Sequence, residues 1–252
     1  MTTIIHIFIK MPSFLAMEIQ MKRLIDFHLL AWKESKFRKP LLLRGARQVG
    51  KTVAARTLGT HFQHFVEINL ETHPEIVAIF EQGNIDPKRI IKDLMATLRL
   101  SEPIWPGRTL LFIDEIQASP RAITALRYFY EEMPGLHVIA AGSLLDFVTH
   151  LVGVPVGRVE FYHMHPMSFL EFLSALGQAT LIEEIINHPP NTAIDDHILT
   201  KGLTYISQYL AIGGMPEAIK KLILSNDPYE AFRVHQSIAQ TYHNDFNKYA
   251  KT

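Results

Sequence analysis

The chain contains no cysteine, which excludes disulfide bonds, thiolate zinc sites and thiol nucleophiles. It also has no net formal charge, because 25 lysines and arginines balance 25 aspartates and glutamates. We therefore expect no global electrostatic attraction to nucleic acid or to anionic membranes, and only a local basic patch could recruit them. Any catalysis must come from oxygen and nitrogen groups.

The apolar start of the chain, residues 3–9, is far shorter than the roughly 20 residues that span a bilayer. No basic residue precedes it and no small-residue cleavage site follows, so it does not resemble a signal peptide. We expect a soluble, cytoplasmic protein without a membrane partner. The 252 residues are 48% hydrophobic, which is enough for one large domain or for a core domain with an appendage.

Hydrophobic runs that predict strands alternate with stretches of helical spacing through the first two thirds of the chain. This alternation predicts an α/β fold in which helices cover both faces of a mostly parallel sheet. After Gly177 only helices are predicted, and they would form a small helical subdomain. The predicted strands are 40–45, 64–70, 109–113, 136–141 and 159–165. The predicted helices are 13–35, 51–58, 74–81, 87–98, 120–132, one after 143, 168–175, 181–187, 195–212, 216–225 and 228–249.

One segment between a predicted strand and a predicted helix matches the phosphate-binding pattern G-x-x-x-x-G-K-[ST]. Glycines let the backbone N–H groups and the helix N-terminus face phosphates, the lysine reaches the β and γ phosphates, and the threonine binds Mg²⁺. An ordinary glycine turn is the alternative. The pattern therefore predicts a P-loop for ATP and Mg²⁺, formed by Gly45, Ala46, Arg47, Gln48, Val49, Gly50, Lys51 and Thr52.

Two adjacent acids, Asp114 and Glu115, end the hydrophobic run 110–113. Asp114 is predicted to bind Mg²⁺ together with Thr52, and Glu115 is predicted to orient or deprotonate the attacking water. This pair favours hydrolysis over phosphotransfer. The alternative is a surface turn after a buried strand, which explains one acid but not its combination with the upstream loop.

Two further polar residues are candidates for catalysis. Ser143 ends the next predicted strand, where it could sense the γ phosphate, although a serine at this place is also a good helix N-cap. Arg158 could stabilise transition-state charge in cis or from a neighbouring subunit, and Arg121 and Arg127 are weaker candidates. The alternative for these arginines is a solvated surface position.

Other polar groups favour less specific interpretations. His163 and His165 would share one strand face, but no third ligand is near, so packing or surface roles are favoured over a metal site. The basic residues Lys33, Lys36, Arg38, Lys39 and Arg44 could touch nucleic acid, yet a solvated helix end beside an anion site explains them better.

Five ordered blocks resemble the bacterial and archaeal AAA-type ATPases whose P-loop domain is followed by a C-terminal domain of unknown function. The blocks are 38–52, 112–117, 141–143, 157–158 with 166–172, and 213–217. The resemblance implies a three-layer P-loop NTPase core, binding and hydrolysis of ATP, catalytic roles for Lys51 and Glu115, and a sensor role for Ser143. Relatives begin near Met21 and continue beyond Thr252. We therefore expect a leader over 1–20, the ATPase core over 21–176, and a helical subdomain with the start of a shortened C-terminal domain over 177–252.

Three functions fit these observations. The leading one is an Mg-dependent ATPase, which could act as a homo-oligomer. The second is a nucleotide-dependent switch that hydrolyses ATP slowly and recruits a protein or nucleic-acid target. The third is an inactive, shortened remnant. The intact Glu115 favours the enzyme.

Overall fold

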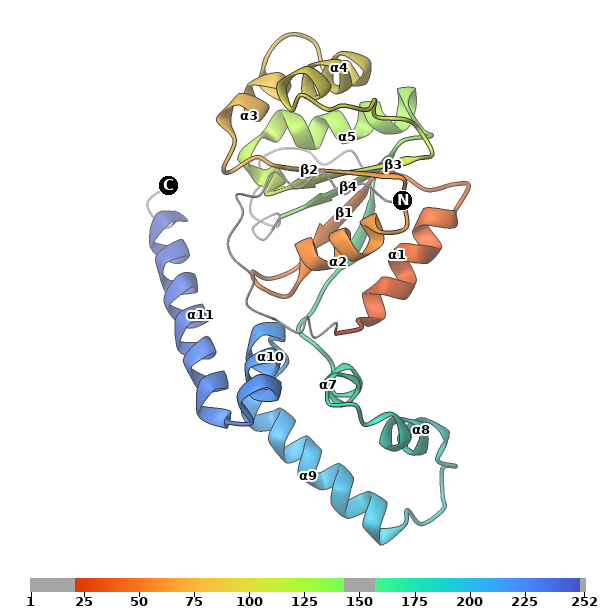
Figure 1. Cartoon of the computed structure of the whole chain (residues 1–252), viewed down its shortest axis with the longest axis vertical. Helices are drawn as coiled ribbons and strands as arrows, with labels where there is room; N and C mark the ends of the chain where they lie inside the picture. Colours follow the sequence, from red (N-terminus) through yellow and green to blue (C-terminus); the bar gives the residue numbers. More distant parts are fainter. Residues whose placement is uncertain (1–20, 143–156, 250–252) are drawn as a thin grey trace. The chain divides into compact units, whose positions relative to one another are not determined.

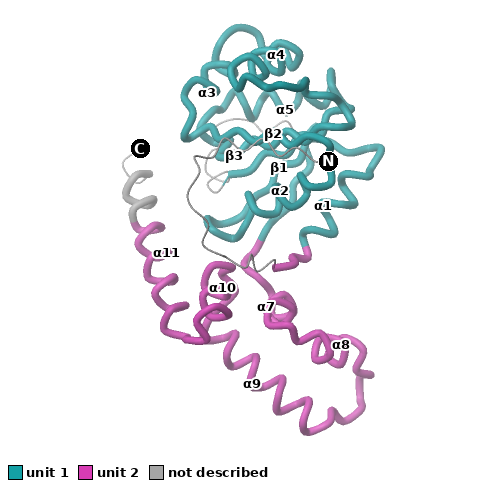
Figure 2. The backbone as a smooth tube through the Cα atoms, in the orientation of Figure 1, with its two compact units in different colours: residues 1–13, 25–164 teal, residues 14–24, 165–252 magenta. Residues whose placement is uncertain are grey.

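The computed structural model describes residues 21–142 and 157–249 of the chain. These residues form two compact units, coloured separately in Figure 2, and we describe each unit by itself. Unit 1 holds the described residues 25–142 and 157–164. Unit 2 holds 21–24 and 165–249.

The described part of unit 1 contains a five-stranded sheet in the order β2-β3-β4-β1-β5. Every neighbouring pair is parallel, so all carboxyl ends of the strands meet at one edge. A parallel sheet is buried on both faces, and β3 and β4 are buried along their whole length. The strands are β1 (Leu41–Arg44), β2 (His64–Asn69), β3 (Thr109–Asp114), β4 (His137–Ala141) and β5 (Glu160–His163).

Helices cover both faces of this sheet, which confirms the predicted three-layer α/β fold (Figure 1). Alternate strand residues such as Leu111 and Ile113 belong to the core beneath α3 (Pro74–Glu81), α4 (Pro87–Thr97) and α5 (Pro120–Glu132). The opposite face carries α1 (Leu24–Glu34) and α2 (Lys51–Gly59) (Figure 1). On that face Phe112 stacks with Phe65, and a Cβ on Gly59 of α2 would lie 2.7 Å from the Phe65 ring.

Unit 2 consists of helices in its described residues. Its core gathers residues from four of them, among them Phe172, Ile212, Ile219 and Val234. Phe172 of α7 belongs to this core, in the part of unit 2 that begins at His165. The helices are α7 (Phe169–Ala175), α8 (Ala179–Asn187), α9 (Asp196–Ile212), α10 (Pro216–Ser225) and α11 (Pro228–Tyr249).

Proline fixes where many of the helices begin. Its φ is already helical and its missing N–H is not needed in the first turn, and α3, α4, α5, α10 and α11 all start at proline. Side-chain caps add to this at Asp86 and Ser119, which accept hydrogen bonds from Lys88 N and Ala122 N. The predicted helices 74–81, 120–132, 216–225 and 228–249 therefore begin where expected, and they also end at the expected residues.

Most other predicted elements begin or end within one or two residues of their observed bounds. The helix expected over 13–35 is observed from Leu24, and residues 1–20 lie outside the described part. The last strand ends at His163 rather than at 165. The helix expected after 143 also lies outside the described residues. Among the helices that the structure describes, none is long and apolar enough to cross a membrane.

Candidate functional site

The loop that follows β1 has a backbone that glycine alone accommodates at its first position. Gly45 has φ of 145°, and a Cβ there would lie 2.2 Å from the carbonyl oxygen of Met164. Gln48 and Gly50 also have positive φ values, 65° and 101°. Positive φ in a non-glycine residue such as Gln48 is costly and concentrates at functional loops.

Helix α2 begins directly after this loop. The first intrahelical hydrogen bond runs from Ala54 N to Gly50 O, 2.9 Å. The N–H groups of Lys51, Thr52 and Val53 therefore stand in the first turn, where a helix has no internal acceptors for them. Such an end binds anions through its N–H groups and its positive dipole.

Lys51 is nearly buried and lies over the loop. Its Nζ donates to the carbonyl oxygens of Gly45 and Ala46, both at 2.8 Å. Burial lowers the pKa of Lys51, while the nearby charges of Glu115 and Asp114 oppose that shift. The structure thus brings the predicted lysine and both predicted acids together.

Asp114 ends β3 and is 7% exposed. Its Oδ2 accepts a hydrogen bond from the Thr52 hydroxyl at 2.9 Å, and its Oδ1 accepts one from Glu115 N at 3.0 Å. Burial raises the pKa of Asp114, against the effect of these two hydrogen bonds. A buried carboxylate beside a hydroxyl is a pair of oxygen ligands of the kind that Mg²⁺ prefers.

Glu115 has a left-handed backbone, with φ of 50° and ψ of 45°. Its Oε2 accepts a short hydrogen bond, 2.5 Å, from the side-chain amide of Gln117. Gln117 has no role predicted from the sequence, although it lies inside the block 112–117. An acid followed two residues later by an amide was the only signal, and it becomes meaningful because the left-handed turn at Glu115 brings the two side chains together.

The strand order explains why these residues meet. The P-loop follows β1 and the acids end β3, with β4 between them, so both lie at the carboxyl edge of the sheet. In open parallel sheets ligands bind outside this edge, where the strand order reverses. Ser143 lies outside the described residues, so its sensor role stays a prediction.

Arg158 lies at the opposite edge. Glu160 pairs with Leu41 at the amino end of β1, so Arg158 precedes this end, whereas Gly45 follows the carboxyl end. At about 3.3 Å per residue their backbones are roughly 15–20 Å apart. Arg158 therefore does not join Lys51, Asp114 and Glu115 at the carboxyl edge, because it precedes its strand and does not follow one. It binds Glu131 Oε1 at 2.9 Å, and its catalytic role, in cis or from another subunit, stays a prediction.

The weaker arginine candidates have structural contacts. Arg127 binds Glu131 at 3.0 Å, and the hydrogen bonds from Arg158 and Arg127 hold the pKa of Glu131 below its usual value. Arg121 donates to the carbonyl oxygens of Phe80 and Gly83. Arg121 therefore ties the end of α3 to α5.

The basic stretch is largely occupied by contacts within unit 1. Arg38 donates to the carbonyl oxygen of Gly135 at 2.9 Å, Lys33 pairs with Glu34, and the Arg44 guanidinium lies 4.2 Å from the ring centre of Phe161. These contacts favour the solvated-helix-end interpretation over a nucleic-acid patch. In the described residues, no group of three or more His, Cys, Asp or Glu is placed to hold a metal ion.

The two remaining blocks of the resemblance have structural roles in unit 2. Ser168 and Glu171 form a capping box at α7, and Glu171 also accepts from Arg23 Nε at 2.9 Å. Met167 N donates to Gly214 O at 2.6 Å, and a Cβ on Gly214 would lie 2.3 Å from Met167 O. The blocks 166–172 and 213–217 thus contact each other within unit 2.

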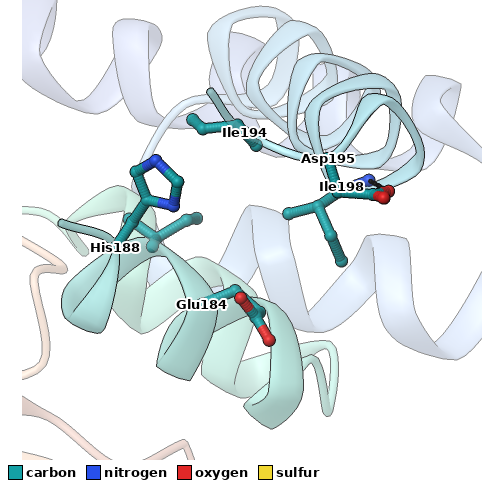
Figure 3. A pocket seen from close by; sticks show the side chains of 6 residues that line it. Glu184, His188, Ile194, Asp195 and Ile198 are labelled. Atoms are coloured by element: carbon teal, nitrogen blue, oxygen red, sulfur yellow. Dashed lines mark hydrogen bonds between the residues drawn. The ribbon is translucent and has the colours of Figure 1, made fainter. Parts of the chain in front are cut away.

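Unit 2 also has a small hollow between α8 and α9, of about 50 Å³ (Figure 3). Glu184, His188 and Asp195 contribute its polar groups, with Ile194 and Ile198 between them. Asp195 already caps α9 by accepting from His197 N at 2.9 Å. Ligand sites for nucleotide-sized molecules take about 300 Å³ or more, so this hollow is no second nucleotide site.

Known proteins resemble this chain in sequence or in structure. Residues 37–173, more than half of the chain, match the family described as "AAA domain". The Walker-type ATPase PABY2304 of Pyrococcus abyssi has a similar structure, with a TM-score of 0.54 at 16% identity over 92% of this chain and 76% of that one. PCH-2 of C. elegans superposes with a TM-score of 0.44 at 14% identity, over 82% and 62%. No curated protein matches the sequence.

Proposed function

Because the chain belongs to the AAA domain family, we propose that its P-loop binds ATP with Mg²⁺ and that Glu115 promotes hydrolysis of the bond between the β and γ phosphates. Family membership supports a nucleotide-binding function of the ATPase type. The observation that carries the finer proposal is the meeting of Lys51, Asp114 and Glu115 at the carboxyl edge of the sheet.

In this proposal the loop after β1 and the start of α2 bind the phosphates. The first-turn N–H groups of α2 and the Lys51 ammonium both favour anions. In the structure, Lys51 hydrogen-bonds to Gly45 O and Ala46 O. In the proposed complex, Lys51 gains phosphate oxygens as partners, which offsets the cost of burying its charge.

Thr52 and Asp114 hold Mg²⁺, which supplies positive charge against the phosphate oxygens when bound. Two observations indicate that Thr52 and Asp114 suit this ion. Their oxygens are 2.9 Å apart, and burial raises the pKa of Asp114, so a cation beside the carboxylate relieves an unfavourable buried charge.

Glu115 acts on water. Its carboxylate accepts a proton as the water oxygen bonds to the γ phosphorus, and the bond from that phosphorus to the bridging oxygen breaks, leaving ADP and phosphate. Gln117 holds one carboxylate oxygen of Glu115 in place. Within this proposal Ser143 senses the γ phosphate, and Arg158 acts only if a second subunit brings it to the site.

Binding and turnover measured on the full chain test the proposal. We expect ATP to bind tightly with Mg²⁺ and weakly in EDTA, and we expect Asp114→Asn to bind in Mg²⁺ no better than the parent in EDTA. Lys51→Ala is expected to lose affinity, because the phosphates lose a buried counterion. Lys36→Ala removes an exposed lysine of the same unit and serves as the matched control.

Two results would contradict the proposal. Equal affinities of the parent and Lys51→Ala would place nucleotide elsewhere. Tight Mg-dependent binding without steady-state phosphate release would refute hydrolysis and favour the nucleotide-dependent switch.

A further inference from the structure

Helix α9 of unit 2 has two apolar sides, and only one of them packs against the described residues of its own unit. Tyr205, Tyr209 and Ile212 belong to the core of unit 2, and the Tyr209 hydroxyl donates to Met167 O at 2.8 Å. Ile212 is the one fully buried residue among the 17 residues of this helix. The remaining apolar residues therefore need another explanation.

Those residues form a stripe on the exposed side of α9. Leu199, Leu203, Ile206 and Leu210 are 44%, 56%, 39% and 76% exposed. They follow each other at intervals of four, three and four residues, which places them along one line of the helix surface. This is the spacing by which helices pair side by side in coiled coils.

The positions that flank the stripe are uncharged. Thr200, Gly202, Ser207 and Tyr209 are the residues next to it, in the places where coiled coils carry the charges that choose a partner. The only lysine of the helix, Lys201, lies on another side. An identical helix would therefore meet no repulsion between like charges at these positions. A different helix would gain no attraction from opposite charges there.

The intervals between the stripe residues, four, three and four, are the same when counted from either end of the helix. When two copies of α9 run antiparallel, Leu199 lies opposite Leu210 and Leu203 lies opposite Ile206, so every apolar residue meets another. An isologous interface requires a patch that complements itself in this way. The antiparallel arrangement also places the positive end of one helix dipole beside the negative end of the other.

We propose that α9 pairs with α9 of a second copy of this chain, antiparallel and symmetric, through the stripe of Leu199, Leu203, Ile206 and Leu210. Four side chains per helix make a short interface, so the dimer is weak, with a Kd on the order of micromolar. The proposal concerns unit 2 and does not depend on nucleotide hydrolysis in unit 1.

Sedimentation velocity of the full chain without nucleotide, over roughly 1–100 µM, tests this pairing. The parent is expected to pass from monomer to dimer over this range. Leu203→Glu is expected to weaken dimerisation at least about tenfold, because each dimer would bury two carboxylates among leucines. Gln208→Glu is the control. It adds the same charge five residues after Leu203, about 140° around the helix from the stripe, so this variant is expected to dimerise like the parent.

The absence of cysteine allows a second, independent readout of orientation. Leu199→Cys and Leu210→Cys chains, mixed and oxidised, are expected to form mixed disulfide dimers, while each chain alone forms few. Far-UV circular dichroism and thermal unfolding confirm that each variant is folded.

Three outcomes would overturn the proposal. The parent could remain monomeric over the whole range, the Leu203→Glu dimer could be as stable as the parent dimer, or each cysteine variant could cross-link to itself more readily than to the other. The last result would mean a parallel arrangement. A monomer would mean that the stripe serves a different protein or another part of the same chain.

Discussion

Glu115 illustrates how neighbouring residues prepare a single side chain. Its left-handed backbone breaks the line of β3, its N–H bonds to Asp114, and its carboxylate accepts from Gln117. A non-glycine residue in this conformation costs of order 1–3 kcal/mol. The surrounding hydrogen bonds offset that cost and fix the direction of the carboxylate.

We predict that Gln117→Leu lowers ATP turnover roughly tenfold or more, because an unoriented base loses part of the 10²–10⁴-fold that general-base catalysis supplies. Leucine keeps the approximate size but cannot donate a hydrogen bond. ATP affinity is expected to stay within about threefold, since Gln117 touches no predicted phosphate ligand.

The matched control is the same change in a Glu115→Gln chain, where we expect no further loss, because the partner carboxylate is already gone. Gln117→Leu with the turnover of the parent would show that this hydrogen bond has no part in catalysis.

The proximity of Lys51, Thr52 and Asp114 could be predicted from the sequence, because a P-loop fixes the spacing of the first two and parallel strands bring their ends to one edge. Gln117 could not be predicted, since its role depends on the backbone angle at Glu115. The position of Arg158 relative to the P-loop could not be predicted, for a topological reason. A residue before a parallel strand lies at the edge opposite to one that follows a strand, and only the position of β5 in the sheet made that clear.

At the scale of elements, the turn from α9 to α10 determines how unit 2 packs. Gly213 has φ of 70°, Gly214 approaches Met167 closely, and Pro216 begins α10. Proline and glycine mark such boundaries in sequence, which is why the predicted helix 216–225 has its observed bounds. The contact between Gly214 and Met167 joins distant segments, and no local pattern predicts it.

We predict that Gly214→Ala destabilises unit 2 by at least about 2 kcal/mol, because the new Cβ overlaps backbone atoms that cannot move independently. Urea unfolding followed by far-UV circular dichroism measures this. Gly202→Ala is the control. No heavy atom lies within 4 Å of a Cβ there, and alanine in a helix is about 0.5–1 kcal/mol more stable than glycine. Equal effects of the two changes would refute the close contact.

At the scale of the molecule, pH acts on unit 1 through a buried histidine. His137 of β4 contacts the rings of Trp32 and Phe62, and its Nε2 lies 3.2 Å from Lys33 O. Burial, aided by the charge of Arg38, lowers the pKa of His137 from 6.5 to about 4. Its Nδ1 has no hydrogen-bond partner among the described residues.

We predict that unit 1 loses stability as the pH falls from about 6.5 to about 4, because in this window the unfolded chain binds a proton that the folded chain does not. At 1.36 kcal/mol per pKa unit the loss from His137 is about 2–3 kcal/mol. His137→Phe keeps the aromatic contacts and cannot titrate. Its free energy of unfolding is therefore expected to fall less with acid than that of the parent. Parallel pH profiles of the two proteins would contradict this.

The comparison of the parent with Glu115→Gln tests the proposed role of Glu115 most directly. The substitution replaces one carboxylate oxygen by an amide group, so it separates the binding of ATP from its hydrolysis. ATP affinity in Mg²⁺ and phosphate release at saturating ATP are measured on the same preparations. We expect affinity within about threefold of the parent and turnover lower by at least about 100-fold, because glutamine keeps the shape of the side chain but cannot accept the proton. Turnover equal to that of the parent would contradict the account, because the base would then not be Glu115.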